Sequence, residues 1–180
     1  MTVQRARAAI ADLTRSVAGF PAPGVVFKDL SPVLADAAGF AAVVEALSEG
    51  FDVDAVAGID ARGFLLGGAI AHRLGVGVIA VRKTGKLPPP VWSCTYDMEY
   101  GTATLEIPAD ALDLRGRRIL IVDDVLATGG TMAAAARLLA RAGAEVVAVA
   151  AVMELDGLDG RGEVERALAT PVPIRVLVTG

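Results

Sequence analysis

The chain has very little cysteine and histidine: Cys94 and His72 are the single examples among 180 residues. One cysteine cannot form a disulfide within the chain, which favours a reducing, cytoplasmic environment. With so few of these residues, a histidine–cysteine zinc site and a Cys-His nucleophile are both disfavoured. We therefore assign no chemical role to either residue.

The sequence also lacks a long apolar run and a surplus of basic residues. Hydrophobic residues make up 54% of the chain, but no run approaches the ~18 residues that a membrane span needs. The 17 Lys and Arg residues against 21 Asp and Glu residues give a net charge of −4. This balance disfavours a nucleic-acid binder, while local charges can still hold a small anionic substrate.

The first residues, MTVQRARAAIADLTRS, carry arginines as a transit peptide does. However, Val3, Ala6, Ile10, Leu13 and Val17 recur at helical spacing, and Asp12 is acidic. We therefore predict a surface helix here. The total length predicts one domain spanning residues 1–180.

Short apolar segments alternate with helical patterns along most of the chain. Phe40, Val43, Val44, Leu47 and Phe51 recur with the period of a helix. Further helices are expected over 64–74 and 131–143, and strands over 55–59, 77–81, 118–122, 145–153 and 174–178. Continuous apolar strands separated by helices predict an α/β fold, with a mainly parallel sheet flanked by helices on both faces.

Residues 86–112 break this alternation. Three consecutive prolines are followed by aromatic and β-branched residues on either side of Gly101. The segment predicts a loop that leads into a two-stranded ribbon projecting from the sheet.

The stretch ILIVDDVLATGGTM, residues 119–132, places two carboxylates at the end of an apolar strand. In open α/β sheets, ligands bind beyond the carboxyl ends of the strands. Asp123 and Asp124 repel each other and need hydroxyls, a metal or cations as partners. The following turn offers backbone N–H groups, two threonine hydroxyls and a helix N-terminus, which suit an anion. Together these elements predict a site for a ribose 5-phosphate, and neither a P-loop nor a dinucleotide fingerprint is present.

This stretch resembles the phosphoribosyl pyrophosphate motif of the type I phosphoribosyltransferases. Four further segments are similar to the adenine phosphoribosyltransferase family, in that family's order: FPAPGVVFKDLSPVL (20–34), GIDARGFLLGGAIA (58–71), VRKTGKLP (81–88) and YDMEYGTATLEI (96–107). The resemblance covers most of the chain. It implies the type I phosphoribosyltransferase fold and a purine-salvage reaction in which adenine and phosphoribosyl pyrophosphate give AMP and pyrophosphate.

The resemblance implies roles for the residues of this stretch. Asp123 and Asp124 would hold the ribose hydroxyls and offset positive charge that develops on the ring. The phosphoribosyl group would be held by these two residues and by Ala127, Thr128, Gly129, Gly130 and Thr131. Mg²⁺ would be the cofactor, held mainly by substrate oxygens and water, with no dedicated set of protein ligands.

The resemblance also implies where pyrophosphate binds. Arg62 would clamp it, next to a cis peptide at Asp60-Ala61. Arg82, Lys83 and Lys86 would supply further cations. In the family the segment that carries these three residues reaches towards the neighbouring subunit's site, which implies a homodimer.

Adenine would bind beneath a hood formed by residues 1 to about 35. Val26 would offer backbone hydrogen bonds, Phe27 and Leu126 an apolar face, and Lys28 stands where some members have arginine. Glu99 would reach the imidazole edge of the purine and help to move its proton. We expect residues 83–103 to form a lid with pivots near Gly85 and Gly101 that shields the reaction from water.

Three alternatives remain open at this point. A 6-oxopurine phosphoribosyltransferase often has aspartate where this chain has Ala127. A regulator that senses phosphoribosyl pyrophosphate and binds nucleic acid would need a basic stripe, which is absent. A purely structural α/β subunit would not need the set of motifs described above.

Overall fold

The computed structural model describes residues 2–20, 22–97 and 101–180. Within these ranges the strands β5 (Val91–Asp97), β6 (Thr102–Pro108), β4 (Gly77–Lys83), β3 (Ala55–Ile59), β7 (Arg118–Leu126), β8 (Glu145–Glu154) and β9 (Ile174–Thr179) form one sheet in that order. The pairs β4–β3, β3–β7, β7–β8 and β8–β9 are parallel, whereas β6 runs antiparallel to both β4 and β5. The mainly parallel α/β sheet predicted from the sequence is confirmed.

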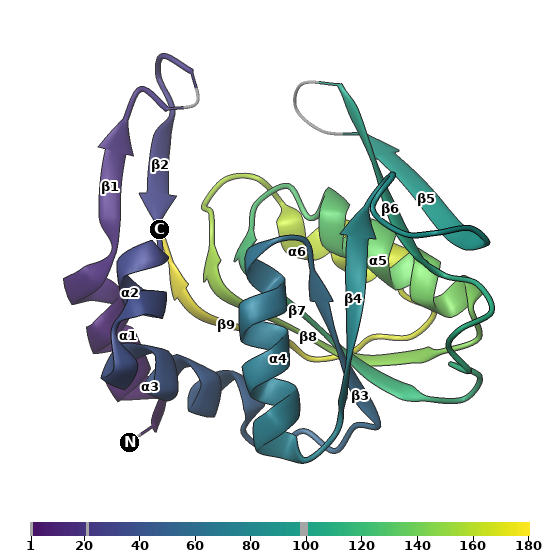
Figure 1. Ribbon diagram of the computed structural model, residues 1–180. Helices are drawn as coiled ribbons and strands as arrows, with labels where there is room; N and C mark the ends of the chain where they lie inside the picture. The colour runs from purple at the N-terminus through teal and green to yellow at the C-terminus, as the bar shows by residue number, and fades with distance from the viewer. Residues whose placement is uncertain (1, 21, 98–100) are drawn as a thin grey trace.

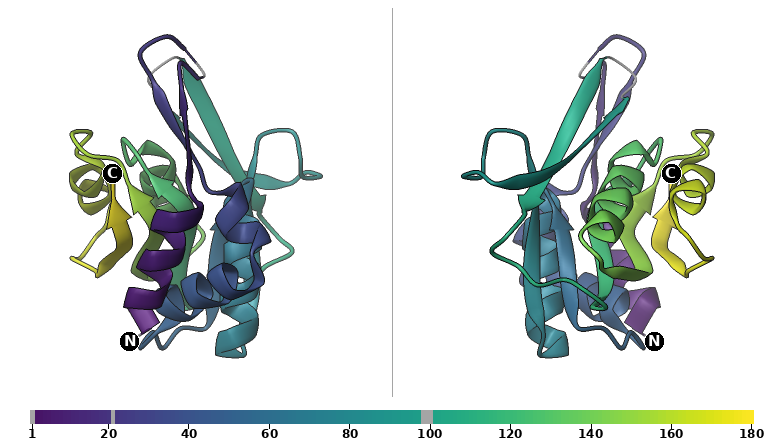
Figure 2. Two further views of the ribbon diagram at one scale, coloured as in Figure 1. Left: turned by 90° about the vertical axis from the view of Figure 1, so that its left-hand side faces the viewer. Right: turned by 90° about the vertical axis from the view of Figure 1, so that its right-hand side faces the viewer.

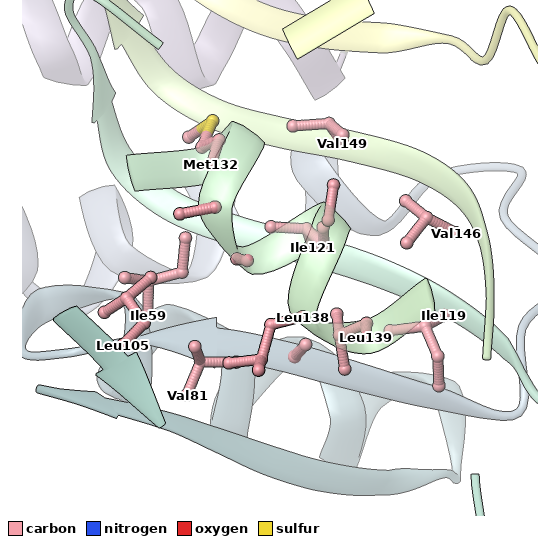
Figure 3. Close-up of a cluster of buried hydrophobic side chains, with 14 of the residues drawn as sticks. Ile59, Val81, Leu105, Ile119, Ile121, Met132, Leu138, Leu139, Val146 and Val149 are labelled. Carbon is pink, nitrogen blue, oxygen red and sulfur yellow. The ribbon is translucent and has the colours of Figure 1, made fainter. Parts of the chain in front are cut away.

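Helices cover both faces of this sheet. One core cluster joins the sheet to α5 (Gly130–Arg141) and α6 (Gly160–Ala167), and Figure 3 shows Leu138 and Leu139 of α5 over Val81, Ile119 and Ile121 of the strands. The other cluster involves α1 (Thr2–Leu13), α2 (Ser31–Ala35), α3 (Ala37–Ser48) and α4 (Arg62–Leu74). Alternate residues of the central strand β7 enter opposite clusters, since Ile119 and Ile121 face α5 while Leu120 and Val122 face the α4 side.

Two antiparallel hairpins project from the same end of the molecule (Figures 1 and 2). One pairs β1 (Arg15–Ala18) with β2 (Val26–Asp29) and forms a sheet of its own. The other is the ribbon β5–β6, whose base continues the main sheet through the pairing of β6 with β4. The ribbon predicted for residues 86–112 is thus confirmed.

Local signals explain two of the helix boundaries. The side chain of Asp36 accepts a hydrogen bond from Gly39 N at 2.7 Å and caps α3. Gly75, with φ of 71°, ends α4 in the left-handed conformation. The stripe predicted over the first helix is right for Ala6 and Ile10, which are buried, but Val17 lies on β1.

Some elements differ from those expected. The strand expected over 118–122 continues as β7 to Leu126, because its pairing with β8 continues to Leu126↔Glu154. Helix α6 has no counterpart in the sequence analysis. Of the described residues, none belongs to a helix long and apolar enough to cross a membrane.

Candidate active site

Asp123 and Asp124, which we term the acid pair, lie where β7 is no longer paired with β3. Pairing of β3 with β7 ends at Gly58↔Val122, while pairing of β7 with β8 continues beyond it. Asp123 and Asp124 therefore lie inside β7 but beyond the carboxyl end of β3, which corrects the expectation that they follow the strand. The space beside them is filled by the first turn of α4.

Glycines allow α4 to approach this closely. A side chain at Gly58 would overlap the backbone of Gly63, and one at Gly67 would lie 3.0 Å from the Cα of Gly58. A Cβ at Gly63 would lie 2.8 Å from the Val122 carbonyl oxygen and 3.1 Å from Asp123 Oδ1. The glycines of GIDARGFLLGG thus place the N-terminus of α4 directly against the acid pair, where its partial positive charge favours carboxylates.

Arg62, the first residue of α4, contacts both the acid pair and the hairpin β1–β2. Its Nε lies 2.7 Å from Asp124 Oδ2, an ion-pair distance without the alignment of a hydrogen bond. Its guanidinium carbon lies 5.7 Å from the centre of the Phe27 ring. The arginine side chain is 34% exposed while that of Asp124 is 7% exposed, so a cation faces solvent above a buried carboxylate.

The surroundings of Asp123 raise the pKa of its carboxyl well above the ordinary value. Desolvation is the main cause, and the neighbouring charge of Asp124 adds to it. The backbone N–H of Asp124, which donates to Asp123 Oδ1 at 2.9 Å, and the charge of Arg62 act in the opposite direction. Ionisation of both carboxyls is therefore unfavourable in the folded protein, which is typical of a functional position.

The segment Ala127–Thr131 connects β7 to α5. Gly129 has φ of 81° and begins α5, and no side chain within the described residues caps that helix. A side chain at Gly129 would overlap the carbonyl oxygen of Gly160, the first residue of α6, and a side chain at Gly160 would overlap that of Ala127. The loop is thus shaped by close backbone packing on α6 and presents the N-terminus of a 12-residue helix, which suits a phosphate.

Arg82, at the end of β4, lies at the same edge of the sheet. Its Nε is 3.5 Å from Asp60 Oδ2, and its guanidinium carbon is 5.6 Å from the centre of the Phe64 ring. Asp60 Oδ2 also accepts a hydrogen bond from Lys83 N at 3.3 Å. The peptide Asp60-Ala61 is cis, as the sequence resemblance implied. Asp60 therefore joins the turn after β3 to the basic segment after β4.

The turn that continues this basic segment is held by Glu106 of β6. The carboxylate is 8% exposed and accepts hydrogen bonds from Thr84 Oγ1 at 2.6 Å and from Gly85 N at 3.0 Å. Lys83 and Lys86 are exposed on either side of these residues. Neither the Asp60 side chain nor Glu106 was predicted from the sequence as part of the site. A glutamate between the buried Leu105 and Ile107 was the available signal.

The side chains that were expected to bind adenine point in different directions. Phe27 faces Arg62 and packs edge-to-face on Phe20, with ring centres 5.2 Å apart. Lys28, on the opposite face of β2, lines a cavity of about 300 Å³ with Thr14, Ser16 and Met153, among other residues. Val26 is 53% exposed, and its backbone is the part expected to contact the base.

Leu126 and Glu99 complete the set of predicted residues. Leu126 is 1% exposed and belongs to the core cluster with α5, where it lies next to Gly160. Glu99 lies outside the described residues, as does Tyr100. The roles of these residues toward adenine stay predictions.

Comparison with known proteins agrees with this arrangement. A family model described as a phosphoribosyl transferase domain matches residues 28–170. This range contains the acid pair, the loop that follows it, Arg62 and Arg82. The fold and the site therefore define the chain as a phosphoribosyltransferase.

Individual relatives narrow the class further. The adenine phosphoribosyltransferase of Mycobacteroides abscessus is 60% identical over 169 residues, which cover 93% of this chain and 93% of that protein. The crystal structure of adenine phosphoribosyltransferase from Rhodothermus marinus matches with a TM-score of 0.86 at 44% identity, covering 97% of this chain and 98% of that chain. The structure of the Saccharomyces cerevisiae enzyme, complexed with an imino-altritol bisphosphate and adenine, matches with a TM-score of 0.85 at 34% identity and covers 96% and 98%. The chain belongs to the adenine phosphoribosyltransferase family, a family of transferases of purine salvage.

Proposed function

We propose that this chain transfers the phosphoribosyl group of phosphoribosyl pyrophosphate to adenine through the site at the carboxyl edge of β3, β4 and β7. The observation that carries the proposal is the acid pair of β7, which lies between Arg62 and a loop built for phosphate. The yeast relative, whose structure contains adenine and a sugar-like bisphosphate, supports the same choice of substrates.

In this proposal the acid pair holds the ribose hydroxyls and stabilises the transition state. The anomeric carbon becomes cationic as its bond to pyrophosphate breaks and before its bond to the purine nitrogen forms. Two carboxylates fixed nearby by β7 stabilise that charge without having to reorganise. Backbone groups from Ala127 to Thr131 hold the 5-phosphate and set the distance of the ribose from the pair.

Arg62, Arg82, Lys83 and Lys86 bind the departing pyrophosphate. Arg62 and Arg82 are held against aromatic rings and carboxylates, so they are positioned before substrate arrives. When pyrophosphate binds, Arg62 can share its charge between the ligand and Asp124. The four cations then balance the negative charge of the leaving group.

Mg²⁺ fits this site as a cofactor. It prefers carboxylate, phosphate and water oxygens, and Asp124 Oδ2 is buried without a hydrogen-bond partner among the described residues, although Arg62 contacts it. The ion would be held mainly by substrate oxygens and water, next to the carboxylates of Asp123 and Asp124. When bound, it would neutralise part of the pyrophosphate charge.

We further propose that the chain works as a homodimer in the cytoplasm. The exposed apolar residues Leu65 on α4 and Val78 on β4 are 58% and 52% exposed, and burial against a second copy would remove both from water. A dimer interface that includes α4 and β4 would also bring the basic segment that follows β4 in one subunit close to the other subunit.

Adenine is proposed to lie between β2 and the acid pair, with Val26, Phe27, Lys28 and Leu126 as its surroundings. Glu99 is proposed to handle the purine proton, and residues 83–103 to close over the substrates. The base of this segment is part of the main sheet through the pairing of β6 with β4. The chain would act as one domain, with residues 1 to about 35 as the hood.

The test is the turnover of the double variant Asp123→Asn, Asp124→Asn with saturating adenine, phosphoribosyl pyrophosphate and Mg²⁺. The amides keep the size of the side chains but remove both charges, so AMP formation should fall by about 100-fold or more. The matched control is Asp52→Asn with Asp54→Asn, another closely spaced pair, which bonds to Arg118 at the opposite end of β7 and should leave turnover unchanged. Near-normal turnover of the acid-pair variant would refute the proposed role.

A further inference from the structure

A hydrogen bond joins the ribbon β5–β6 to the loop Ala127–Thr131, which we term the phosphate loop. The hydroxyl of Thr131, in the first turn of α5, donates to the hydroxyl oxygen of Tyr96, near the end of β5, at 3.1 Å. Tyr96 is 8% exposed, and the proposed mechanism gives it no role. The two residues are 35 positions apart in the sequence, so only the fold brings them together.

The backbone around this contact is closely packed. A Cβ at Gly130 would lie 3.2 Å from the Asp97 carbonyl oxygen and 3.3 Å from Tyr96 Cδ2. Further along the same two elements, the guanidinium carbon of Arg141 lies 4.8 Å from the centre of the Trp92 ring. Strand β5 therefore packs along α5, and this packing holds the phenol of Tyr96 next to Thr131.

We propose that Tyr96 is a positioning residue, which directs the O–H of Thr131 toward the 5-phosphate of the substrate. This inference rests on the proposed function of the loop as the phosphate site. A phosphate oxygen only accepts hydrogen bonds, so Thr131 can serve it only by turning its O–H away from Tyr96. Each hydroxyl is both a donor and an acceptor, so the phenol O–H then donates to Thr131 Oγ1 and the direction of the bond reverses without movement of either side chain.

The reversal gives Tyr96 an effect that is specific to the occupied site. The chain from phenol to threonine to phosphate is cooperative, because each donor is polarised by the next acceptor. The backbone N–H groups of the loop are fixed by the fold and need no such help. The threonine hydroxyl is a rotor, and its direction depends on the phenol beside it.

The variant Tyr96→Phe tests this with little change in shape. We expect its Kd for ribose 5-phosphate to rise about five- to tenfold, as for the loss of one ordinary hydrogen bond, here the one between Tyr96 and Thr131. The KM for phosphoribosyl pyrophosphate should rise with it, while kcat stays within about twofold. The control is Thr104→Val, which removes a hydroxyl pair between Thr95 and Thr104 on the same ribbon and should leave ribose 5-phosphate binding unchanged.

A double-mutant cycle separates positioning from a general structural effect. In a Thr131→Val background, Tyr96→Phe should change ribose 5-phosphate binding by less than about twofold, and Thr131→Ser should keep the wild-type dependence on Tyr96. Wild-type binding by Tyr96→Phe, or an undiminished loss in the Thr131→Val background, would overturn the inference. Failure of the proposed function would look different, since wild-type protein would then bind ribose 5-phosphate yet form no AMP, or would not bind it at all.

Discussion

The acid pair and the phosphate loop are adjacent in the chain but are built in opposite ways. The pair carries its charge on side chains. Burial raises the pKa of the Asp123 carboxyl, so ionisation of this group opposes folding. The loop from Ala127 to Thr131 has no charged side chain and is shaped by contacts between the backbones of Gly129, Gly160 and Ala127. The acid pair is therefore electrostatically unfavourable in the free protein, whereas the loop is well packed.

The two regions therefore suit different tasks. Fixed backbone donors suit a phosphate that keeps its charge throughout the reaction, so they contribute binding. Carboxylates that are unfavourable in the free protein gain most when positive charge develops beside them, so in the proposed mechanism they stabilise the transition state. Substitutions in the loop should therefore affect stability and binding, whereas substitutions in the acid pair should affect turnover without loss of stability.

The largest effect on folding is expected for Gly129→Ala. The new methyl group requires a non-glycine residue at φ of 81° and overlaps the Gly160 carbonyl oxygen, so the free energy of unfolding should fall by about 2–4 kcal/mol. Denaturant unfolding measures this, and calorimetry should show weaker binding of ribose 5-phosphate. Gly50→Ala is the control, since Gly50 has φ of 74° but open space around it. Equal losses for the two variants would mean that packing on α6 does not shape the loop.

A smaller effect is expected for Arg62→Met. The substitution leaves the 7% exposed carboxylate of Asp124 without its cation, so the free energy of unfolding should fall by about 1 kcal/mol and the KM for phosphoribosyl pyrophosphate should rise. Arg115→Met removes an ion pair in which both side chains are exposed, and it should change neither quantity. A stable Arg62→Met variant with an unchanged KM would remove Arg62 from the pyrophosphate site.

The smallest effect on stability is expected for Asp123→Asn, and the sign of this change is informative. A carboxyl with a raised pKa in the folded state stabilises the fold most below its ordinary pKa, and that stability is lost as pH rises through the raised value. The asparagine variant has no such loss, so it should melt at a higher temperature than wild type at neutral pH, with an advantage that shrinks on acidification.

Asp113→Asn provides the opposite case for the same measurement. The Arg115 side chain hydrogen-bonds Asp113 and lowers the pKa of its carboxyl, so this group contributes stability above its ordinary pKa that is lost on acidification. Its replacement should give no increase in melting temperature at neutral pH. If Asp123→Asn instead destabilised the protein at neutral pH, the acid pair would be a structural feature and the contrast with the loop would be wrong.

The sequence predicted elements whose signals are local. The strand 55–59 was predicted with its observed bounds, and the ribbon and the glycine turn after β7 were recognised from proline, glycine and β-branched residues. The extent of β7 was underestimated because carboxylates are poor strand residues, and the ladder to β8 overrides that preference.

The contacts that assemble the site could not be read in the same way. Asp60 meets Arg82 and Arg62 meets Asp124 because β3 lies between β4 and β7, and no local pattern encodes that order of strands. The hydrogen bond between Tyr96 and Thr131 likewise depends on how β5 packs along α5. Residue types and their spacing thus indicated the chemistry, while the partners of each residue depended on the topology.

The choice of adenine as the base can be measured by the rate of nucleotide formation from phosphoribosyl pyrophosphate with adenine and with hypoxanthine. Ala127 lacks the carboxylate that 6-oxopurine enzymes often use, and each partner of the 6-amino group left unpaired costs roughly 1–3 kcal/mol. We expect kcat/KM for adenine to exceed that for hypoxanthine by about 100-fold or more. Comparable values for the two bases would contradict it and would favour a 6-oxopurine phosphoribosyltransferase.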